Sequence, residues 1–299
     1  MSSQNKRAMI VGSAGQDGVL LTEHLQPLNY QVVPVTKKDD LSKLSFTGID
    51  EIYYLAAYHH TSQDQIPDEA ELLRKSTEVH VTGLGHCLEG ILKAGHKARL
   101  FYASSSMVFG KPASTSQSES TPLAPDTAYG ITKQQGMLLC KKYRETKGVY
   151  ASSGILYNHE SRYRKPQFLS RKVVLAATRI KNGSQEKLKL GDLDSTVDWS
   201  DARDFVRAFQ LILQCKEPQD FVISSGIGHT VRDFVQTTFG LLNLDWKDHV
   251  ELDKDLIQRA KHTLVGNSSK LKMQTKWVPQ YDFKTMIRDM IMAEGVSID

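Results

Sequence analysis

Three polar residues in the middle of the chain could together move a proton on or off a carbinol oxygen. Tyr129 and Lys133 are four residues apart, so on a helix their side chains project from one face, one turn apart. A phenol has a pKa of about 10, and a neighbouring ammonium should bring the pKa of Tyr129 toward neutrality. The hydroxyl of Ser105 could hold a substrate oxygen beside the phenol while a cofactor takes or gives a hydride. The alternative is an ordinary helix with a Tyr/Lys pair.

A glycine-rich stretch near the N-terminus is flanked by elements that favour a dinucleotide-binding turn. The apolar run 8–11 predicts a buried strand, and the apolar positions within 20–25 predict a helix. Glycines between such elements let the backbone approach a pyrophosphate at the helix N-terminus. The expected cofactor contacts here are Gly12, Gly15, Gln16, Asp17 and Gly18. A glycine-punctuated turn without a ligand is the alternative.

The end of the next strand should select the cofactor. Residues 31–35 predict this strand, and Thr36-Lys37-Lys38-Asp39-Asp40 follows it. An acid at this point suits the ribose hydroxyls of NAD, whereas a base suits the extra phosphate of NADP. Because Lys37 precedes Asp40, the sequence favours NADP, with NAD as the alternative, and both residues are candidate contacts. The lysines could instead solvate a loop.

Further strands alternate with helices. Strands are predicted over 51–57, 100–106 and 153–157, and helices over 69–94 and 129–147. This alternation predicts an α/β fold, a Rossmann-type doubly wound parallel sheet whose ligands lie at the carboxyl ends of the strands. Further cofactor contacts are therefore expected from Leu55, Ala56, Ala57, Leu156, Asn158 and His159. The Ser-, Thr- and Pro-rich stretch 111–126 reads as an active-site loop.

The pattern changes after Asn158. A basic loop, 161–166, has the composition to hold phosphates, although a solvated surface loop would look the same. Later helices are predicted over 168–181, 201–214, 230–241 and 283–293, mixed with short strands. We therefore expect a dinucleotide-binding domain over 1–160, to which segments of about 190–224 return. Residues 161–299 would mainly form a smaller mixed α/β substrate domain.

Composition excludes several classes of protein. The 299 residues carry a formal net charge of +4 without a dense Lys/Arg block, which suits an anionic small molecule better than nucleic acid. The three cysteines are far apart, and the adjacent His59 and His60 point to different sides, so no metal site is expected. No signal peptide or membrane span is visible, which predicts a cytoplasmic protein with no membrane partner.

Longer stretches of the sequence resemble one branch of the extended short-chain dehydrogenases/reductases. The branch contains the GDP-mannose 4,6-dehydratases and the neighbouring GDP-4-keto-6-deoxymannose reductases. The Asn-His-Glu-Ser run of 158–161 and the Leu-Gly-Asp-Leu-Asp run of 190–194 are specific to it. Other matching stretches are 12–18, 104–106, 129–133, 168–172, 198–199, 204–206, 223–226 and 264–267.

This resemblance implies roles for individual residues. Tyr129 would transfer the proton, Lys133 would be its electrostatic partner and ribose ligand, and Ser105 would face the substrate. Ser106, Met107 and Arg164 would also contact the substrate. The sugar and diphosphate would meet Asn158, Lys172 and the late arginine, Arg259. The resemblance also implies a nucleotide-diphosphate sugar as the small-molecule partner and a homodimer.

Several residues depart from the family pattern and limit which of the family's reactions this chain could catalyse. Dehydratases carry Glu two residues after the Ser105-type hydroxyl, and this chain has Met107, whose thioether cannot exchange a proton. Val197 stands where the family has an arginine that contacts the nucleotide diphosphate. The basic loop reads Arg-Tyr-Arg-Lys over 162–165 instead of Pro-Arg-Arg-Gly, and Lys261 and His262 lie where an acid is usual.

The remaining chemistry is reversible hydride and proton transfer at a carbinol carbon. The sequence therefore predicts an NAD(P)-dependent enzyme, favouring a 4-keto (deoxy)sugar nucleotide reductase. The alternatives are a nucleotide-sugar 4-epimerase or 4-dehydrogenase, or a 4,6-dehydratase with a displaced acid/base. A non-enzymatic dinucleotide sensor on the same fold is the remaining alternative, against which the intact Ser/Tyr/Lys set argues.

Overall fold

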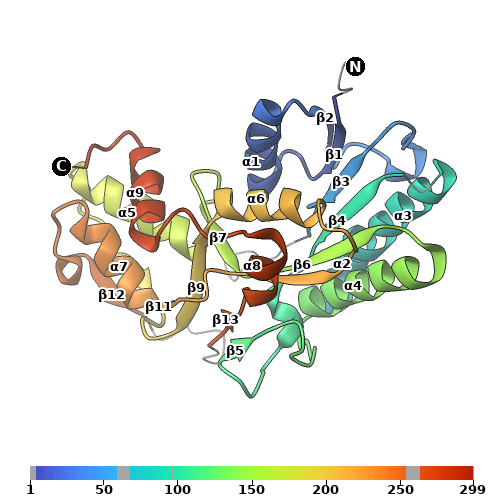
Figure 1. Cartoon of the computed structure of the whole chain (residues 1–299). Helices are drawn as coiled ribbons and strands as arrows, with labels where there is room; N and C mark the ends of the chain where they lie inside the picture. Colours follow the sequence, from blue (N-terminus) through green and yellow to red (C-terminus); the bar gives the residue numbers. More distant parts are fainter. Residues whose placement is uncertain (1–4, 59–67, 96, 254–262, 299) are drawn as a thin grey trace.

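A six-stranded parallel sheet forms the centre of the larger lobe (Figure 1). The computed structural model describes residues 5–58, 68–95, 97–253 and 263–298. The strand order is β10-β6-β4-β3-β1-β2, and every neighbouring pair is parallel. The strands are β1 (Arg7–Val11), β2 (Gln31–Val35), β3 (Glu51–Tyr54), β4 (Arg99–Ala103), β6 (Ala151–Leu156) and β10 (Asp220–Ile223). The predicted Rossmann-type doubly wound sheet is confirmed.

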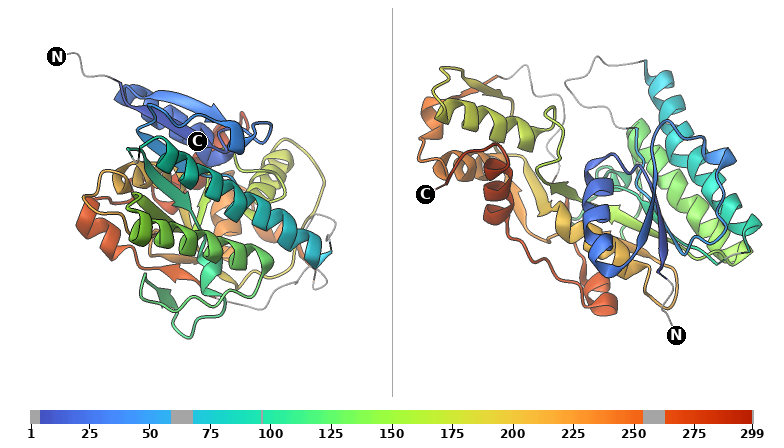
Figure 2. Two further views of the ribbon diagram at one scale, coloured as in Figure 1. Left: turned by 90° about the vertical axis from the view of Figure 1, so that its right-hand side faces the viewer. Right: turned by 90° about the horizontal axis from the view of Figure 1, so that it is seen from above.

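Helices cover both faces of this sheet, as the view from above shows (Figure 2). The helices α1 (Gln16–Leu25) and α6 (Ala202–Ile212) lie against one face. The other face carries α2 (Glu69–Thr77), α3 (Gly83–Lys93) and α4 (Ala128–Lys147). Because both faces are covered, β3 and β6 are buried at every position, as expected for central parallel strands.

The strand β2 is the outermost strand of the sheet on one side, within the part of the chain that the structure describes. The usual dinucleotide-binding order places a further strand beyond the second one. Here the chain returns from β2 to β3 through residues 36–50, with a single helical turn, η2 (Leu41–Lys43). The exposed Pro34 fits an edge strand because proline has no N–H to pair. The end of β2 therefore leads directly into the loop that carries Lys37 and Asp40.

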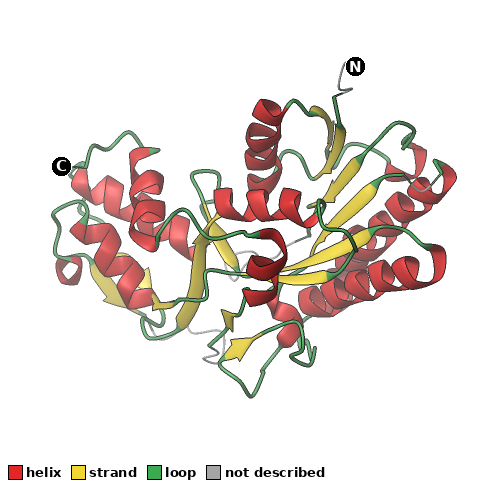
Figure 3. Cartoon of the chain, in the orientation of Figure 1, coloured by secondary structure: helices red, strands yellow, loops and turns green. Residues whose placement is uncertain are grey.

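A smaller lobe contains short strands and three packed helices (Figure 3). The helices α5 (Leu169–Lys181), α7 (Val231–Gly240) and α9 (Phe283–Met292) contact one another. A three-stranded sheet runs β11 (Gly228–Thr230), β9 (Thr196–Asp201) and β7 (Asn158–Glu160), and β12 (Val250–Leu252) pairs with β8 (Leu188–Leu190). Between the lobes, β5 (Ser116–Gln117) pairs with β13 (Val265–Gly266), followed by α8 (Ser269–Thr275). Buried apolar side chains form two clusters, one in each lobe.

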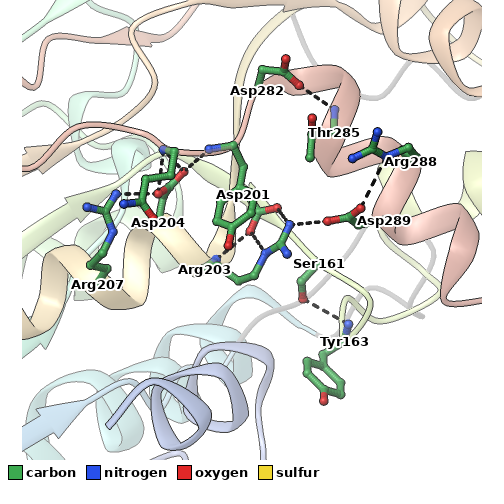
Figure 4. A network of polar contacts seen from close by, with 12 residues as sticks. Ser161, Tyr163, Asp201, Arg203, Asp204, Arg207, Asp282, Thr285, Arg288 and Asp289 are labelled. Atoms are coloured by element: carbon green, nitrogen blue, oxygen red, sulfur yellow. Dashed lines mark hydrogen bonds and ion pairs between the residues drawn. The ribbon is translucent and has the colours of Figure 1, made fainter. Parts of the chain in front are cut away.

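A polar network joins α6 of the larger lobe to α9 of the smaller one (Figure 4). The guanidinium of Arg203 contacts both oxygens of Asp201 at 2.9 and 2.6 Å and reaches Asp289 at 2.6 Å. It also lies over the ring of Tyr281, 3.6 Å from its centroid. The nearby buried Asp204 accepts hydrogen bonds from the backbone N–H groups of residues 280 and 281. These contacts fix the segment that leads into α9.

Several predicted element boundaries were wrong. The helix predicted over 69–94 is interrupted by a π-helical turn, η3 (Glu78–Thr82). The strand predicted over 51–57 ends at Tyr54, where the glycine turn packs against the backbone of Ala56. The strand predicted over 100–106 ends at Ala103, because Ser105 caps the short helix η4 (Ser106–Phe109) by accepting from the Met107 N–H. The loop 111–126 contains β5.

Candidate active site

The glycine turn after β1 forms a cradle at the N-terminus of α1. Gly12 has φ +95°, and its N–H donates to the carbonyl of Val35 at 2.9 Å, which ties the turn to the end of β2. A Cβ on Gly12 would lie 2.8 Å from the Ala56 nitrogen, and one on Gly18 would lie 2.5 Å from the Gly12 oxygen. Gly15 caps α1 without a side-chain hydrogen bond and is exposed. The turn therefore leaves helix N–H groups open to an anion, as a dinucleotide pyrophosphate requires.

Ser105, Tyr129 and Lys133 meet at the carboxyl end of β4. Thr127 caps α4 through the N–H of Gly130 at 3.1 Å and so places Tyr129 in its first turn. The Ser105 side chain hydrogen-bonds to Tyr129. The Lys133 Nζ is buried, donates to the Ala103 carbonyl at 2.8 Å and lies 5.6 Å from the centre of the Tyr129 ring. The structure thus brings the three predicted catalytic residues together.

The electrostatics of this group differ from the expectation. Burial raises the pKa of Tyr129 to about 12, against the opposing effects of Arg164 and the Ser105 hydrogen bond. Burial also lowers the pKa of Lys133 to about 7, although Asp17 counteracts it. The prediction that the ammonium lowers the pKa of the phenol was wrong for the protein without a cofactor. Both side chains lose their hydration on burial, and the Lys133 amine donates to the Ala103 carbonyl instead of the phenol. At neutral pH the phenol keeps its proton.

A buried ion pair joins the glycine turn to β7. The carboxylate of Asp17 lies 3.0 and 3.1 Å from the Nε2 of His159, whose Nδ1 contacts the Tyr157 carbonyl at 2.7 Å. Burial opposes both charges, but the mutual attraction outweighs it, lowering the pKa of Asp17 and raising that of His159. Gln16 donates to the His159 carbonyl at 3.0 Å and accepts from Ser161 at 2.9 Å. The predicted cofactor residues Gln16, Asp17 and His159 therefore form one network.

Arg164 adds a cation to this network. Its Nε lies 3.1 Å from the buried carboxylate of Glu160, and its guanidinium stacks on Phe168 at 3.6 Å from the ring centroid. The charge of Arg164 influences the ionisation of Tyr129, Asp17 and His159. Glu160 also accepts from Ser170 at 2.6 Å. The predicted substrate residue Arg164 thus stands close enough to the tyrosine group to act on it electrostatically.

The other predicted residues occupy several parts of the molecule. Those at strand ends of the large sheet are Lys37, Asp40, Leu55, Ala56, Ala57, Ser106, Met107 and Leu156, and Asn158 follows as the exposed first residue of β7. Asp40 accepts from the hydroxyl and N–H of Ser42 and so caps η2. Lys172 lies on α5, where its Nζ donates to the Lys189 carbonyl at 2.9 Å. Arg259, His59 and His60 lie outside the described residues.

Three contributors to the site, His80, Thr132 and Phe205, were missed from the sequence. His80 lies edge-on to the Tyr129 ring, with the centroids 5.2 Å apart, and Thr132 hydrogen-bonds to it. A third, Phe205 of α6, stacks on His159 with the centroids 4.4 Å apart. A lone histidine or phenylalanine in a helical pattern carries no functional signal, so only the fold could reveal these contacts.

Neither a metal-binding cluster nor a membrane-spanning helix occurs among the described residues. No three His, Cys, Asp or Glu side chains there lie close enough together to hold a metal ion. None of the helices described is both long enough and apolar enough to cross a membrane.

Sequence comparisons agree on one family. The profile of the family described as GDP-mannose 4,6 dehydratase matches residues 42–290. GDP-mannose 4,6 dehydratase 2 of Arabidopsis thaliana is 34% identical over 327 residues, covering 96% of this chain and 86% of the relative. The human GDP-mannose 4,6 dehydratase is 28% identical over 344 residues, covering 98% and 92%.

Solved structures share the fold at low identity. RMD from Pseudomonas aeruginosa, solved with NADPH, has a TM-score of 0.85 at 20% identity, with 97% of this chain and 99% of that one covered. The dTDP-glucose 4,6-dehydratase of Bacillus anthracis, solved with NAD, has a TM-score of 0.83 at 18% identity, with 97% and 96% covered.

Proposed function

The chain belongs to the GDP-mannose 4,6-dehydratase family of extended short-chain dehydrogenases/reductases, and from this premise we propose that it is an NAD(P)-dependent reductase of 4-keto (deoxy)sugar nucleotides. The observation that carries the proposal is Met107 beside an otherwise complete Ser105, Tyr129 and Lys133 group. This group is sufficient for proton transfer at a carbonyl oxygen. It does not supply the carboxylate that removal of a C5 proton requires.

The residues present fit a dinucleotide. A side chain at Gly12 or Gly18 would clash with backbone, while the exposed Gly15 leaves the N-terminus of α1 open to a pyrophosphate. At the end of β2, Asp39 accepts from the N–H and hydroxyl of Thr36, so its carboxylate is turned toward the strand end, whereas Lys37 and Lys38 are exposed. This arrangement supports NADP over NAD, because the lysines could neutralise the additional phosphate.

Nearby carboxylates do not replace the missing glutamate. Asp17 is engaged by His159 and Gln16, and Glu160 is buried between Ser170 and Arg164. The side chain of Met107 offers only an apolar wall. Among the described residues around Tyr129, proton transfer therefore falls to the phenol itself, which supports reduction over dehydration.

In the proposed reaction, a reduced dinucleotide held by the glycine turn would supply the hydride that the C4 carbonyl carbon requires. Tyr129 donates its proton to the carbonyl oxygen as the C–O double bond becomes a single bond, so a ketone becomes an alcohol. The phenol suits this direction because it is protonated at neutral pH. Ser105 holds the same oxygen, and Lys133 stabilises the phenolate that remains until it regains a proton.

We propose a groove between α5 and β8 as the place of the nucleotide diphosphate. This groove has a volume of about 230 Å³ and is lined by Lys172, Ala176, Arg179, Glu186, Lys187, Leu188 and Lys189. Burial lowers the pKa of the Lys172 amine, which an incoming phosphate would reverse. The lysines that line this groove, Lys172, Lys187 and Lys189, would supply the positive charge in place of the arginine that Val197 replaces, so the diphosphate would be held differently from the family pattern.

Dehydration is the second candidate, because the family profile and the curated relatives carry that activity in their names. A 4-epimerase or 4-dehydrogenase would use the same three residues. Mass spectrometry after incubation with NADPH and GDP-linked or dTDP-linked 4-keto-6-deoxy sugars should show the gain of two hydrogens. Loss of one water from GDP-mannose would establish dehydration instead, and an unchanged mass with an altered retention time would indicate epimerisation.

The variant Tyr129→Phe tests the proposed role of the Tyr129 hydroxyl as the proton donor. The variant should lose turnover by about 100-fold or more, the usual range for removing a general acid. Its NADPH affinity should stay within about twofold, because the ring and the fold are kept. Full activity in this variant would refute the assignment.

We further propose a homodimer formed through α2 and α4, which pack side by side. Both helices expose apolar side chains, with Leu73 41%, Ile131 36% and Leu138 55% exposed. Two of them are seven residues apart on α4 and so share a face. Leu138→Glu should convert a dimer to a monomer in light-scattering chromatography. The exposed Lys147 lies nine positions further along α4, on the opposite side of the helix, so Lys147→Glu should not.

The two clusters of buried apolar residues support the domain division proposed from the sequence. The larger cluster holds the six-stranded sheet together with α6, and the smaller one holds α5, α7 and α9. The three cysteines are free, and two of them are buried, which supports a reducing, cytoplasmic location.

A further inference from the structure

His80 lies at an irregular turn beside the catalytic tyrosine. It is fully buried within the π-helical turn η3, which separates α2 from α3. Single π turns inside helices occur frequently at functional sites, because they displace one residue from the regular helical pattern. Here the Val79 carbonyl accepts from the hydroxyl of Tyr54 at the end of β3. The turn is thus attached to the strand end that lies beside the glycine turn.

Two hydrogen bonds determine which nitrogen of His80 carries the proton. The Tyr58 N–H can only donate, and it reaches the Nε2 at 3.0 Å, so this nitrogen must be unprotonated. In the neutral ring the Nδ1 then carries the hydrogen and donates to the Thr132 hydroxyl at 2.8 Å. Thr132 in turn donates to the Ala128 carbonyl at 2.9 Å, one turn back on α4. Both ring nitrogens are engaged, so His80 is poorly placed to exchange protons with a substrate.

The ring of His80 instead acts on the tyrosine through contact. Its plane is perpendicular to that of Tyr129, with the centroids 5.2 Å apart, an edge-to-face arrangement. Thr132 lies between Tyr129 and Lys133 in the sequence of α4, so the hydrogen bond holds the same helical turn that carries both catalytic residues. The bond from Tyr58 joins this turn to the segment after β3.

We propose that His80 is a positioning residue, which rests on the proposed function of Tyr129 as the proton donor. Its two hydrogen bonds fix the first turn of α4 relative to the end of β3, and its ring sets the angle of the phenol. A carbonyl carbon held between cofactor and phenol demands this alignment, because small displacements of reacting groups reduce rates steeply. No proton passes through His80 itself.

Two variants test the proposal. His80→Phe keeps a buried aromatic edge but loses both hydrogen bonds. Thr132→Val keeps the shape of the side chain but removes the bond to Nδ1, together with the bond of the Thr132 hydroxyl to the Ala128 carbonyl. Each should lower kcat about 10-fold or more with a 4-keto-6-deoxy nucleotide sugar and NADPH, since displacing a reacting group can cost about 100-fold. The KM for the sugar and the Kd for NADPH should stay within about twofold. The double variant should be no slower than His80→Phe, since both changes break one path.

A matched control is Thr146→Val on the same helix, whose hydroxyl also bonds one turn back, to the Lys142 carbonyl at 2.8 Å, but lies exposed. It should leave kcat unchanged. If His80 has only a structural role, its replacement should lower the melting temperature while kcat per folded site stays constant, and this result would overturn the proposal. The proposal would also be wrong if the two single changes lowered kcat independently, so that their effects multiplied in the double variant. If Tyr129→Phe keeps full activity, the proposed function fails. If Tyr129→Phe is inactive but His80→Phe and Thr132→Val keep the kcat of the parent, the proposed function stands and the positioning role of His80 fails.

Discussion

Replacing Lys133 by methionine should make the protein more stable while it abolishes turnover. The amine is 1% exposed, and burial lowers its pKa from 10.5 to about 7. Because each pKa unit corresponds to about 1.4 kcal/mol, the folded protein holds this proton less favourably than the unfolded chain by about 5 kcal/mol. Methionine has a similar shape without the charge. It loses the hydrogen bond to the Ala103 carbonyl, which should cost about 1–2 kcal/mol.

The pH dependence follows from the direction of the shift. Below the folded pKa of about 7, both the folded and the unfolded protein keep the proton, and the whole destabilisation is present. Between about 7 and 10.5 the folded protein releases the proton and the unfolded chain keeps it, so the destabilisation declines as the pH rises. Lys133→Met should therefore exceed the parent by about 3 kcal/mol near pH 6, and the difference should vanish near pH 10.

Urea unfolding followed by tryptophan fluorescence, without added dinucleotide, measures this difference at about pH 6, 8 and 10. Lys142→Met, an exposed lysine on the same helix, is the control and should stay within about 0.5 kcal/mol of the parent at each pH. If Lys133→Met is less stable than the parent at the lowest pH, the buried ammonium is stabilising and the reasoning is wrong. If Lys133 does destabilise the fold by this amount, its presence is explained by its function and not by a contribution to stability.

Three further changes test other parts of the site. Asp17→Asn should lower the unfolding free energy by about 3 kcal/mol between about pH 4 and 6.5, where the carboxylate and the imidazolium of His159 are both charged, and by less outside this window in urea titrations. Met107→Glu should add water loss from GDP-mannose, detectable by mass spectrometry. Gly18→Ala should weaken NADPH binding at least about 10-fold in fluorescence titrations, because the new methyl meets the Gly12 carbonyl.

Local patterns were enough to predict the sheet and the proximity of Ser105, Tyr129 and Lys133. Apolar runs marked the strands, and the spacing of Tyr129 and Lys133 needed only the helix that forms there. Ser105 follows β4 and Tyr129 opens α4, so the parallel order of the sheet brings them to the same edge. The fold and the centre of the site were therefore predictable without any long-range information.

Contacts between distant segments were not predictable in this way. Asp17 and His159 are separated by 142 positions, and only the packing of β7 against the N-terminus of α1 makes them an ion pair. The π turn that carries His80 lies inside a continuous helical pattern, which has no signal for an inserted residue. The pKa of Lys133 depends on complete burial, which spacing does not reveal. In each of these cases the sequence gives the type of residue, but the property depends on the surroundings that the fold creates for it.

The opposite pKa shifts of Tyr129 and Lys133 have a joint consequence for the reaction. When the phenol gives its proton to a carbonyl oxygen, the phenolate left behind favours a charged amine nearby, so the protonated form of Lys133 assists the transfer. In the free protein this form is lost as the pH rises above about 7. We therefore expect kcat/KM for reduction, which reports the free enzyme, to fall about tenfold per pH unit above about pH 7. A profile that stays flat to about pH 9 would contradict this coupling, whereas Lys133→Arg, whose charge persists, should remove the fall in any residual activity.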